Sequence, residues 1–249
     1  MNKIDKLKEM VNESKNIVFF TGAGVSTESG IKDFRSKDGL YNEKNNYKYP
    51  PEFMLSRTCF YNDTKEFYKF YKDKMNTLKY EPNITHKFIK DLEKDKNVTV
   101  VTQNIDGLHT KAGSKNVYEL HGTVNKNYCI DCNKEYSASY VFKSKGIPKC
   151  TCGGTIKPKV VLYEEALPEY EFIESEKAIK NADMLIVAGT SLTVYPASGL
   201  VNLFKGKYFV ILNKDETPYD YKADLVIHDK LSKVIKELCD ENRRNKNTK

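Results

Sequence analysis

The chain has little of what membrane-spanning and exported proteins need. A transmembrane helix takes about 18 or more consecutive apolar residues, and no such run occurs. The chain also lacks a hydrophobic secretory segment at its start. These absences predict a protein that neither spans a membrane nor uses a signal peptide, and we expect a cytoplasmic location.

Tryptophan is absent, and arginine occurs at only four positions. The net charge of +7 would fit nucleic-acid binding, but the lysines are scattered and mostly alternate with acids, as in 90–96. Arginine, the residue best suited to bind a phosphate through two hydrogen bonds, is too scarce to form a patch. We interpret the lysines as a solvated surface and expect no nucleic-acid partner.

Five short apolar runs are typical of buried parallel strands. They span residues 16–20, 98–101, 184–188, 208–212 and 225–227. Helical patterns lie before, between and after them, at 1–15, 61–78, 83–95, 169–181, 196–204 and 230–239. This alternation predicts an α/β fold, with a Rossmann-like doubly wound parallel sheet.

The stretch 122–157 interrupts this alternation and contains two close cysteine pairs. We interpret it as a small inserted zinc-ribbon domain. The Rossmann-like domain would then comprise 1–121 and 158–240, with part of 36–80 forming a helical portion of the small domain. The polar tail, 241–249, is expected to fray.

The two cysteine pairs have the spacing of metal ligands. Cys129 and Cys132 are separated by two residues, and Cys150 and Cys152 by one, which is slightly shorter than usual. Two such turns can close a tetrahedral zinc site, and four thiolates leave no open position for a substrate. We therefore predict a structural zinc ion rather than a catalytic one.

A glycine-rich segment, 20–30, follows the first predicted strand. Its backbone amides could hold a pyrophosphate, but Thr27 stands where a dinucleotide fingerprint has its third glycine. A phosphate-binding loop and a plain tight turn remain equally compatible with these residues. Phe34 and Arg35 follow at once and would lie close to any bound ligand.

Two further strands also end in polar residues. Ligands of open α/β sheets bind beyond the carboxyl ends of strands, so the cluster in 101–109 is a candidate site, although one of its members could cap a helix. The segments 189–197 and 212–214 offer small or polar groups to a ribose or phosphate. The candidates are Gln103, Asn104, Asp106, Thr190, Ser191, Asn213 and Lys214.

His121 is the candidate for proton transfer. It is followed by Gly122 and lies at the border of the inserted domain, and domain borders favour binding sites. Histidine is the side chain best suited to exchange protons near neutral pH. Spacing alone does not eliminate His86, His109 or His228.

In this order, the segments resemble the sirtuins, the NAD-dependent protein-lysine deacylases. The resemblance is nearly full-length. It consists of Gly-Ala-Gly-x-Ser at 22–26, Asp-Phe-Arg at 33–35, Thr-Gln-Asn-Ile-Asp at 102–106, His-Gly at 121–122, the four cysteines, Gly-Thr-Ser at 189–191 and Leu-Asn at 212–213.

The resemblance implies that NAD and an acetyl-lysine protein or peptide enter the site from opposite sides. The acyl oxygen would attack the ribose of NAD and displace nicotinamide. His121 would then act as general base on the ribose hydroxyls. The products would be nicotinamide, O-acetyl-ADP-ribose and free lysine. The residues implied to contact NAD are Gly22, Ala23, Gly24, Ser26, Thr27, Phe34, Arg35, Gln103, Asn104, Ile105, Asp106, His121, Gly189, Thr190, Ser191, Asn213, Lys214, Asp229 and Lys230.

The resemblance also implies that Val161, Leu162, Tyr163 and Glu164 pair with the substrate backbone. Glu164 departs from the family's usual glycine, and we hypothesise that its charge favours basic flanking residues. Relatives that remove succinyl or malonyl groups carry Tyr-x-x-Arg where this chain reads Tyr68-Lys69-Phe70-Tyr71, so we expect an apolar acyl group.

Other functions remain alternatives. Protein mono-ADP-ribosylation and removal of longer acyl chains keep the cofactor and change the reaction. A non-catalytic NAD sensor is disfavoured by the intact His121, Asn104 and Asp106, and a dehydrogenase by the missing third glycine.

Overall fold

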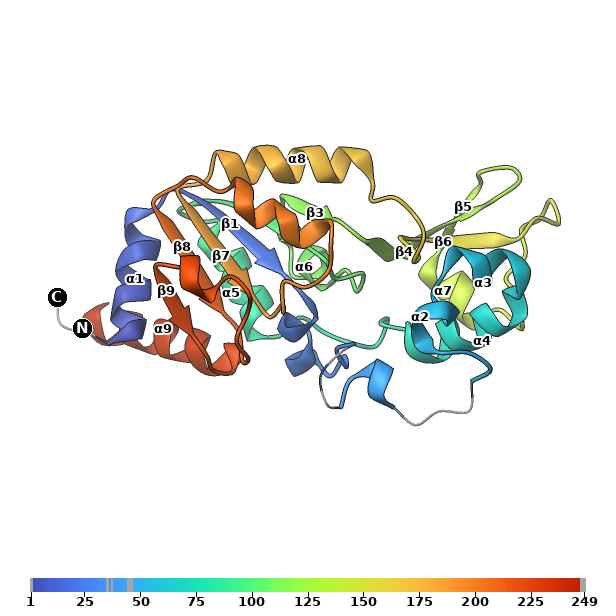
Figure 1. The fold of residues 1–249 in the computed structure, drawn as a ribbon, viewed down its shortest axis with the longest axis horizontal. Coiled ribbons are helices and arrows are strands. Elements are labelled where there is room, and N and C mark those ends of the chain that lie inside the picture. The colour runs from blue at the N-terminus through green and yellow to red at the C-terminus, as the bar shows by residue number, and fades with distance from the viewer. Residues whose placement is uncertain (1, 35, 37, 44–46, 247–249) are drawn as a thin grey trace.

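The computed structural model describes residues 2–34, 36, 38–43 and 47–246. It has a large α/β domain and a small domain beside it (Figure 1). Helix α1 (Lys3–Glu13) and the end of α9 (Leu231–Lys246) lie at the end of the large domain farthest from the small one. No helix in the described ranges is long and apolar enough to cross a membrane.

The large domain is built on a six-stranded sheet in the order β3-β2-β1-β7-β8-β9. All its neighbouring strands are parallel, so their carboxyl ends meet at one edge. The predicted doubly wound sheet is confirmed. Short β3, partly buried and at the sheet edge, was not predicted. The strands are β1 (Asn16–Thr21), β2 (Asn97–Thr102), β3 (Val117–Glu119), β7 (Met184–Ala188), β8 (Tyr208–Leu212) and β9 (Leu225–Ile227).

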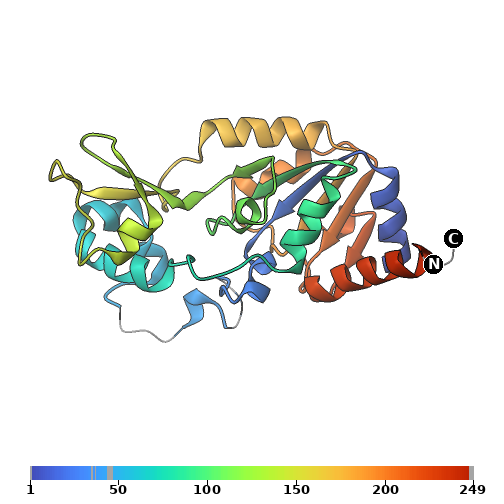
Figure 2. The same ribbon diagram turned by 180° about the vertical axis from the view of Figure 1, so that it is seen from behind.

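Helices cover both faces of this sheet, because alternate strand residues point to opposite sides. Ile17 and Phe19 belong to a core with α1, α5 (Ile84–Leu92) and α9, whereas Val18 and Phe20 belong to a core with α8 (Glu169–Lys180) and η4 (Ala197–Leu203). Figure 2 shows α8 and α9 on opposite sides of the sheet. The helix expected at 196–204 is a 3₁₀-helix.

Two expected helix boundaries are wrong. The helix expected at 61–78 is instead α3 (Arg57–Asn62) and α4 (Thr64–Lys74), separated at Asp63, whose φ of −140° and ψ of 56° are not helical. The last helix, expected at 230–239, is α9 and continues as far as Lys246. Apolar residues of α9 pack on the large domain at its start, and the helix extends from that anchor.

The small domain combines three antiparallel strands, in the order β5-β4-β6, with four helices. Its core contains Phe60, Phe67 and Tyr71 from the helical segment together with Val124 and Ile156 from the sheet. Strand β6 continues to Val160, so the boundary placed at 157 cuts through a strand. The elements are α2 (Pro51–Met54), α3, α4, β4 (Gly122–Cys129), β5 (Glu135–Ser137), α7 (Ala138–Lys143) and β6 (Ile156–Val160).

Short elements connect these parts and carry much of the site. They are η1 (Ala23–Val25), η2 (Thr27–Ser29), η3 (Leu40–Asn42), α6 (Leu108–Lys111) and η5 (Asp220–Lys222).

Candidate active site and metal centre

The glycine-rich loop after β1 is bound to the end of β7. The amide of Gly22 donates to Ala188 O at 3.1 Å, and the amide of Gly24 donates to Gly189 O at 2.8 Å. A Cβ on Gly24 would lie 2.8 Å from the Gly189 Cα atom, which is closer than real Cβ contacts. The glycines are therefore required because two backbones touch at this edge of the sheet.

A polar network connects this loop to the segment after β2. The hydroxyl of Ser26 donates to Asp106 Oδ2 at 2.7 Å, and the amide of Leu108 donates to Asp106 Oδ1 at 2.8 Å. The side-chain amide of Asn104 donates to Gly22 O at 3.0 Å and to Ser26 Oγ at 3.2 Å. The structure thus brings together four of the predicted cofactor residues, Gly22, Ser26, Asn104 and Asp106.

Asp106 is almost fully buried, at 8% exposed. Its burial raises the pKa of the carboxyl, and the hydrogen bonds from Ser26 and the Leu108 amide oppose that rise. A buried carboxyl held in this way is typical of functional sites.

His121 is oriented by a backbone carbonyl. Its Nδ1 atom lies 2.8 Å from Gln103 O. A carbonyl oxygen can only accept a hydrogen bond, so Nδ1 carries the proton and the neutral ring has its basic lone pair on Nε2. The side chain of Gln103 in turn donates to Thr190 Oγ1 at 3.1 Å. This contact fixes the tautomer and leaves Nε2 as the ring atom that can accept a proton.

Glu119 was not among the predicted site residues, although it precedes His121 by two positions. It ends β3, opposite Thr102 of β2. Partial burial raises its pKa to about 7, a hydrogen bond from Thr123 opposes the rise, and Asp106 adds repulsion. The sequence gives no sign of this, because the burial depends on how β3 packs.

The competing histidines have other surroundings. His86 and His109 are buried with ring centroids 4.7 Å apart, and burial lowers the pKa of both, for His86 to about 4. His109 Nε2 lies 3.1 Å from Thr21 Oγ1, behind the glycine-rich loop. His228 pairs with Asp220 at 3.0 Å, beyond β9. Burial therefore removes two of the three from contact with a ligand.

Asn83 is a second residue that the sequence did not reveal. Its side chain caps α5 and also donates to Val25 O at 2.7 Å and to Ser29 Oγ at 3.0 Å. It fixes the far end of the glycine-rich loop, 58 residues along the chain from Val25.

The remaining predicted cofactor residues follow the carboxyl ends of successive strands. Ser191 Oγ lies 2.8 Å from Thr193 Oγ1 after β7, and the amide of Asn213 donates to Ile227 O at 3.2 Å after β8. Lys214 is exposed beside Asn213, and Asp229 and Lys230 come one strand farther out, after β9.

Phe34 packs edge-on against Tyr41, with the two ring centroids 5.4 Å apart. Ile105 contacts the core of the small domain, and its carbonyl accepts from the Val124 amide at 2.9 Å. Arg35 lies outside the described residues.

The segment 161–164 joins His121 to the small domain. The amide of Val161 donates to His121 O at 2.8 Å. The amide of Tyr163 donates to Leu55 O, and its carbonyl accepts from the Arg57 amide, both at 3.0 Å. The Tyr163 backbone is thus already paired within the chain.

The side chain of Glu164 contacts Thr58 of the small domain. Its Oε2 accepts from the Thr58 amide at 2.9 Å and from the Thr58 hydroxyl at 2.7 Å, in the first turn of α3. These hydrogen bonds lower the pKa of Glu164. Glu164 is exposed and keeps its negative charge beside Thr58, so its preference for basic flanking residues stays a prediction.

Tyr68 and Tyr71 are fully buried in the core of the small domain, at 1% and 0% exposed. Tyr68 donates its hydroxyl to Ile156 O. The ring of Tyr71 stacks on Phe67 and Phe142, with centroids 5.5 Å apart in both pairs.

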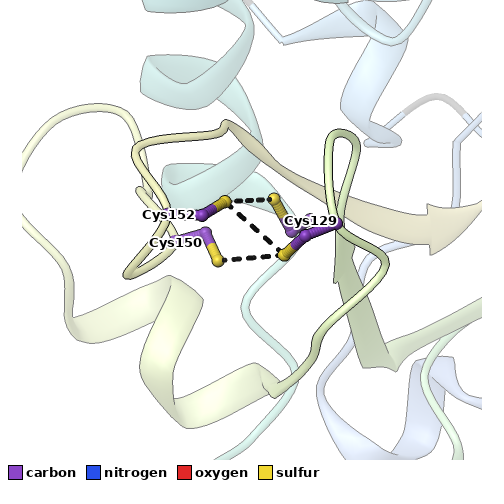
Figure 3. A group of neighbouring side chains, drawn as sticks. Cys129, Cys150 and Cys152 are labelled. Atoms are coloured by element: carbon purple, nitrogen blue, oxygen red, sulfur yellow. Dashed lines mark hydrogen bonds between the residues drawn. The ribbon is translucent and has the colours of Figure 1, made fainter.

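Four cysteines converge at the tip of the small sheet, where they could hold a metal ion (Figure 3). Their sulfurs all lie within 4.8 Å of one another, and three pairs are 3.5 Å apart. A tetrahedral ion with Zn–S bonds of 2.3 Å places sulfurs about 3.8 Å apart, whereas a disulfide requires about 2.05 Å. The ligands Cys129, Cys132, Cys150 and Cys152 therefore fit one zinc ion.

Comparisons with known proteins agree with this geometry. The Sir2 family model matches residues 22–196. An NAD-dependent protein deacetylase of Clostridium acetobutylicum is 55% identical over 96% of this chain and 98% of its own length. One from Clostridium perfringens is 53% identical over 96% of this chain and 99% of its own.

A solved complex of Sir2 with a p53 peptide and NAD+ aligns with 97% of this chain and 99% of its own, with a TM-score of 0.85 and 35% identity. A second, of Sir2 bound to an acetylated peptide, also covers 97% of this chain and 99% of its own, with a TM-score of 0.85 and 34% identity. The match with the family model spans both the glycine-rich loop and the four cysteines. This chain belongs to the Sir2 family.

Proposed function

We propose that the chain is an NAD-dependent protein-lysine deacetylase that yields nicotinamide, O-acetyl-ADP-ribose and the deacetylated protein. One observation carries the proposal: the Nδ1 atom of His121 is held by Gln103 O beside the network of Ser26, Asn104 and Asp106. The names of the relatives and the peptide-bound and NAD-bound neighbours support it.

Each part of the network has a proposed task toward NAD. The loop from Gly22 to Thr27, with Phe34 and Arg35, binds the pyrophosphate and nicotinamide ends. Asn104, Ile105 and Asp106 line the nicotinamide side, and Gln103 faces the ribose. Gly189, Thr190, Ser191, Asn213, Lys214, Asp229 and Lys230 bind the adenosine side.

When bound, NAD supplies an electrophilic ribose carbon and a nicotinamide leaving group. His121 Nε2 would accept a proton from a ribose hydroxyl, and Gln103 O would stabilise the charged ring by accepting a hydrogen bond from Nδ1. General-base help of this kind contributes about 10²–10⁴-fold to rate.

The four cysteines would hold a structural zinc ion. Four protein ligands leave no position for a substrate, so the metal's contribution is to fold the small domain. Thiolate ligands persist where cysteines stay reduced, and on this ground we also propose a cytoplasmic location.

Acetyl-lysine proteins or peptides are the proposed partners, with the segment Val161–Glu164 as their docking strand. The test is incubation with NAD and peptides that differ only in the acyl group on one lysine, with nicotinamide and peptide mass followed together. Equal release of nicotinamide and deacetylated peptide is expected, fastest for the acetyl peptide. Faster turnover of longer acyl chains, or a peptide that gains ADP-ribose, would favour the alternative deacylase or ADP-ribosyltransferase.

A further inference from the structure

A buried ion pair lies directly beneath the proposed docking segment. Lys157 of β6 and Glu165 approach to 3.1 Å, with side chains only 5% and 21% exposed. Lys157 also lies over the ring of Phe60, 5.8 Å from its centroid. Lysine is rarely buried unless it is paired.

The pair is connected to the backbone of the segment. Glu165 Oε2, the atom that binds Lys157, also accepts from the Leu162 amide at 2.9 Å. The amide of Glu165 donates back to Leu162 O at 3.0 Å. Lys157 Nζ in addition lies 3.5 Å from Val160 O. One carboxylate and one ammonium therefore define a closed turn over 162–165.

This turn is continuous with the catalytic histidine. Leu162 is buried at 2% exposed, and the preceding residue, Val161, donates its amide to His121 O at 2.8 Å. A shift of the turn would therefore shift the docking strand relative to His121.

The electrostatics make the pair sensitive to loss of either partner. Burial lowers the pKa of Lys157, and the charge of Glu165 opposes that effect. Removal of one member of a buried pair leaves an uncompensated charge, which is more damaging than removal of both.

A second carboxylate, that of Glu164, also holds the docking segment. Glu164 has a φ of 75°, in the left-handed region that favours glycine, and its carboxylate is held by Thr58 of α3. The two neighbouring carboxylates thus fix the segment to different parts of the small domain.

We propose that Lys157 and Glu165 are positioning residues that hold the docking segment 161–164 in register with His121, so that acetyl-lysine peptides bind without first ordering it. This inference rests on the proposed function. Neither residue touches the reacting atoms, so both act on peptide binding and leave NAD binding unchanged.

The experiment compares Lys157→Met, Glu165→Gln, the double variant and Lys157→Arg in the full-length, zinc-loaded enzyme. KM for an acetyl-lysine peptide, KM for NAD and kcat are measured, and thermal unfolding and zinc content verify folding. The matched control is Lys180→Met, which breaks an exposed pair with Glu176 at 3.2 Å on α8.

Lys157→Met is expected to raise the peptide KM about tenfold, which corresponds to about 1.4 kcal/mol, with kcat and the NAD KM within about twofold. The double variant should lose less than the sum of the single losses, and Lys157→Arg and Lys180→Met should stay near wild type. If Lys157→Met does not fold, Glu165→Gln decides, because it removes the charge that pairs with Lys157 and should raise the peptide KM in the same direction.

A peptide KM within twofold of wild type in folded Lys157→Met or Glu165→Gln overturns the inference, as does an equal loss in kcat or NAD affinity. A wild-type enzyme that turns over no acetyl peptide refutes the proposed function and this inference together. If the wild type is active and the Lys157 and Glu165 variants have an unchanged peptide KM, only the inference is refuted.

Discussion

The two domains are stabilised by different means. The large domain buries aliphatic strands such as Met184–Ala188 between two layers of helices, with separate cores on the two faces of its sheet. The small domain has one core, in which Phe60, Phe67 and Tyr71 pack against a three-stranded sheet. Its four clustered cysteines lie in and beside that core.

The difference follows from the size of each sheet. Six parallel strands covered on both sides are expected to bury enough apolar surface to fold alone. A three-stranded sheet is expected to bury less, and small domains with limited cores commonly depend on a metal. The site joins these two parts, so removal of a metal from the small domain should separate their behaviour.

The largest expected effect is that of metal removal. Structural zinc contributes about 10–16 kcal/mol in small metal-dependent domains, so chelation should unfold the small domain and abolish peptide turnover while NAD binding persists. Near-ultraviolet circular dichroism follows the aromatic core of the small domain, and calorimetry follows NAD.

Cys132→Ser should reproduce this loss, and Cys239→Ser, in α9 outside the cluster, should not. Parallel loss of NAD binding would show that the two domains depend on one metal together.

The next largest effect is that of removing the His121 side chain, which lies where the two domains meet. His121→Ala should lower turnover about 10²–10⁴-fold, or about 3–5 kcal/mol in activation free energy, because no other base replaces Nε2. Nicotinamide release and calorimetric NAD affinity are measured on the same preparation. Turnover within tenfold of wild type would contradict the assignment of His121 as base.

A third, smaller effect concerns Glu119, at the edge of the large sheet. With its pKa raised to about 7 from about 4.3 when unfolded, the folded chain holds a proton that the unfolded chain has lost. Stability from this group is therefore fully present below about pH 4 and declines as the pH rises through 7, by about 1–3 kcal/mol.

Glu119→Gln should flatten this dependence in guanidinium unfolding between pH 4 and 8, while exposed Glu135→Gln should leave it unchanged. An unaltered slope in Glu119→Gln would exclude this carboxyl as the source.

The smallest effect compares the two cores with one substitution. Ile186→Val in β7 and Ile156→Val in β6 each remove one buried methylene and should cost about 0.5–1.5 kcal/mol. In thermal unfolding, Ile156→Val should lower the midpoint temperature of the small domain, whose transition depends on the metal. Ile186→Val should lower that of the large domain, whose transition depends on NAD. If both variants shift a single transition equally, the two domains unfold as one unit.

The large domain was largely predictable because its strands are buried on both faces. Such strands read as unbroken apolar runs, and all five predicted runs lie in the sheet. Strand β3 was not predicted because its three residues are only partly buried. In the small domain, the break at Asp63 escaped because residues on both sides of it have helical periodicity, although Ser56, which caps α3, is a visible start signal.

The site was predictable only where chain order determines position. Residues after parallel strands must meet at one edge, which is why Gly22, Asn104 and Thr190 were found together. The contact of Glu164 with Thr58 joins residues 106 positions apart, and no local pattern encodes it. The burial that raises the pKa of Glu119 likewise exists only after β3 has packed.

His121 is bound at both ends. Its ring binds Gln103 O of the large domain, and its carbonyl binds the Val161 amide, where the chain leaves the small sheet. One residue thus connects a loop of the large domain to the strand that leaves the small one. Any change in the relative position of these two segments would act on both hydrogen bonds of His121 at once.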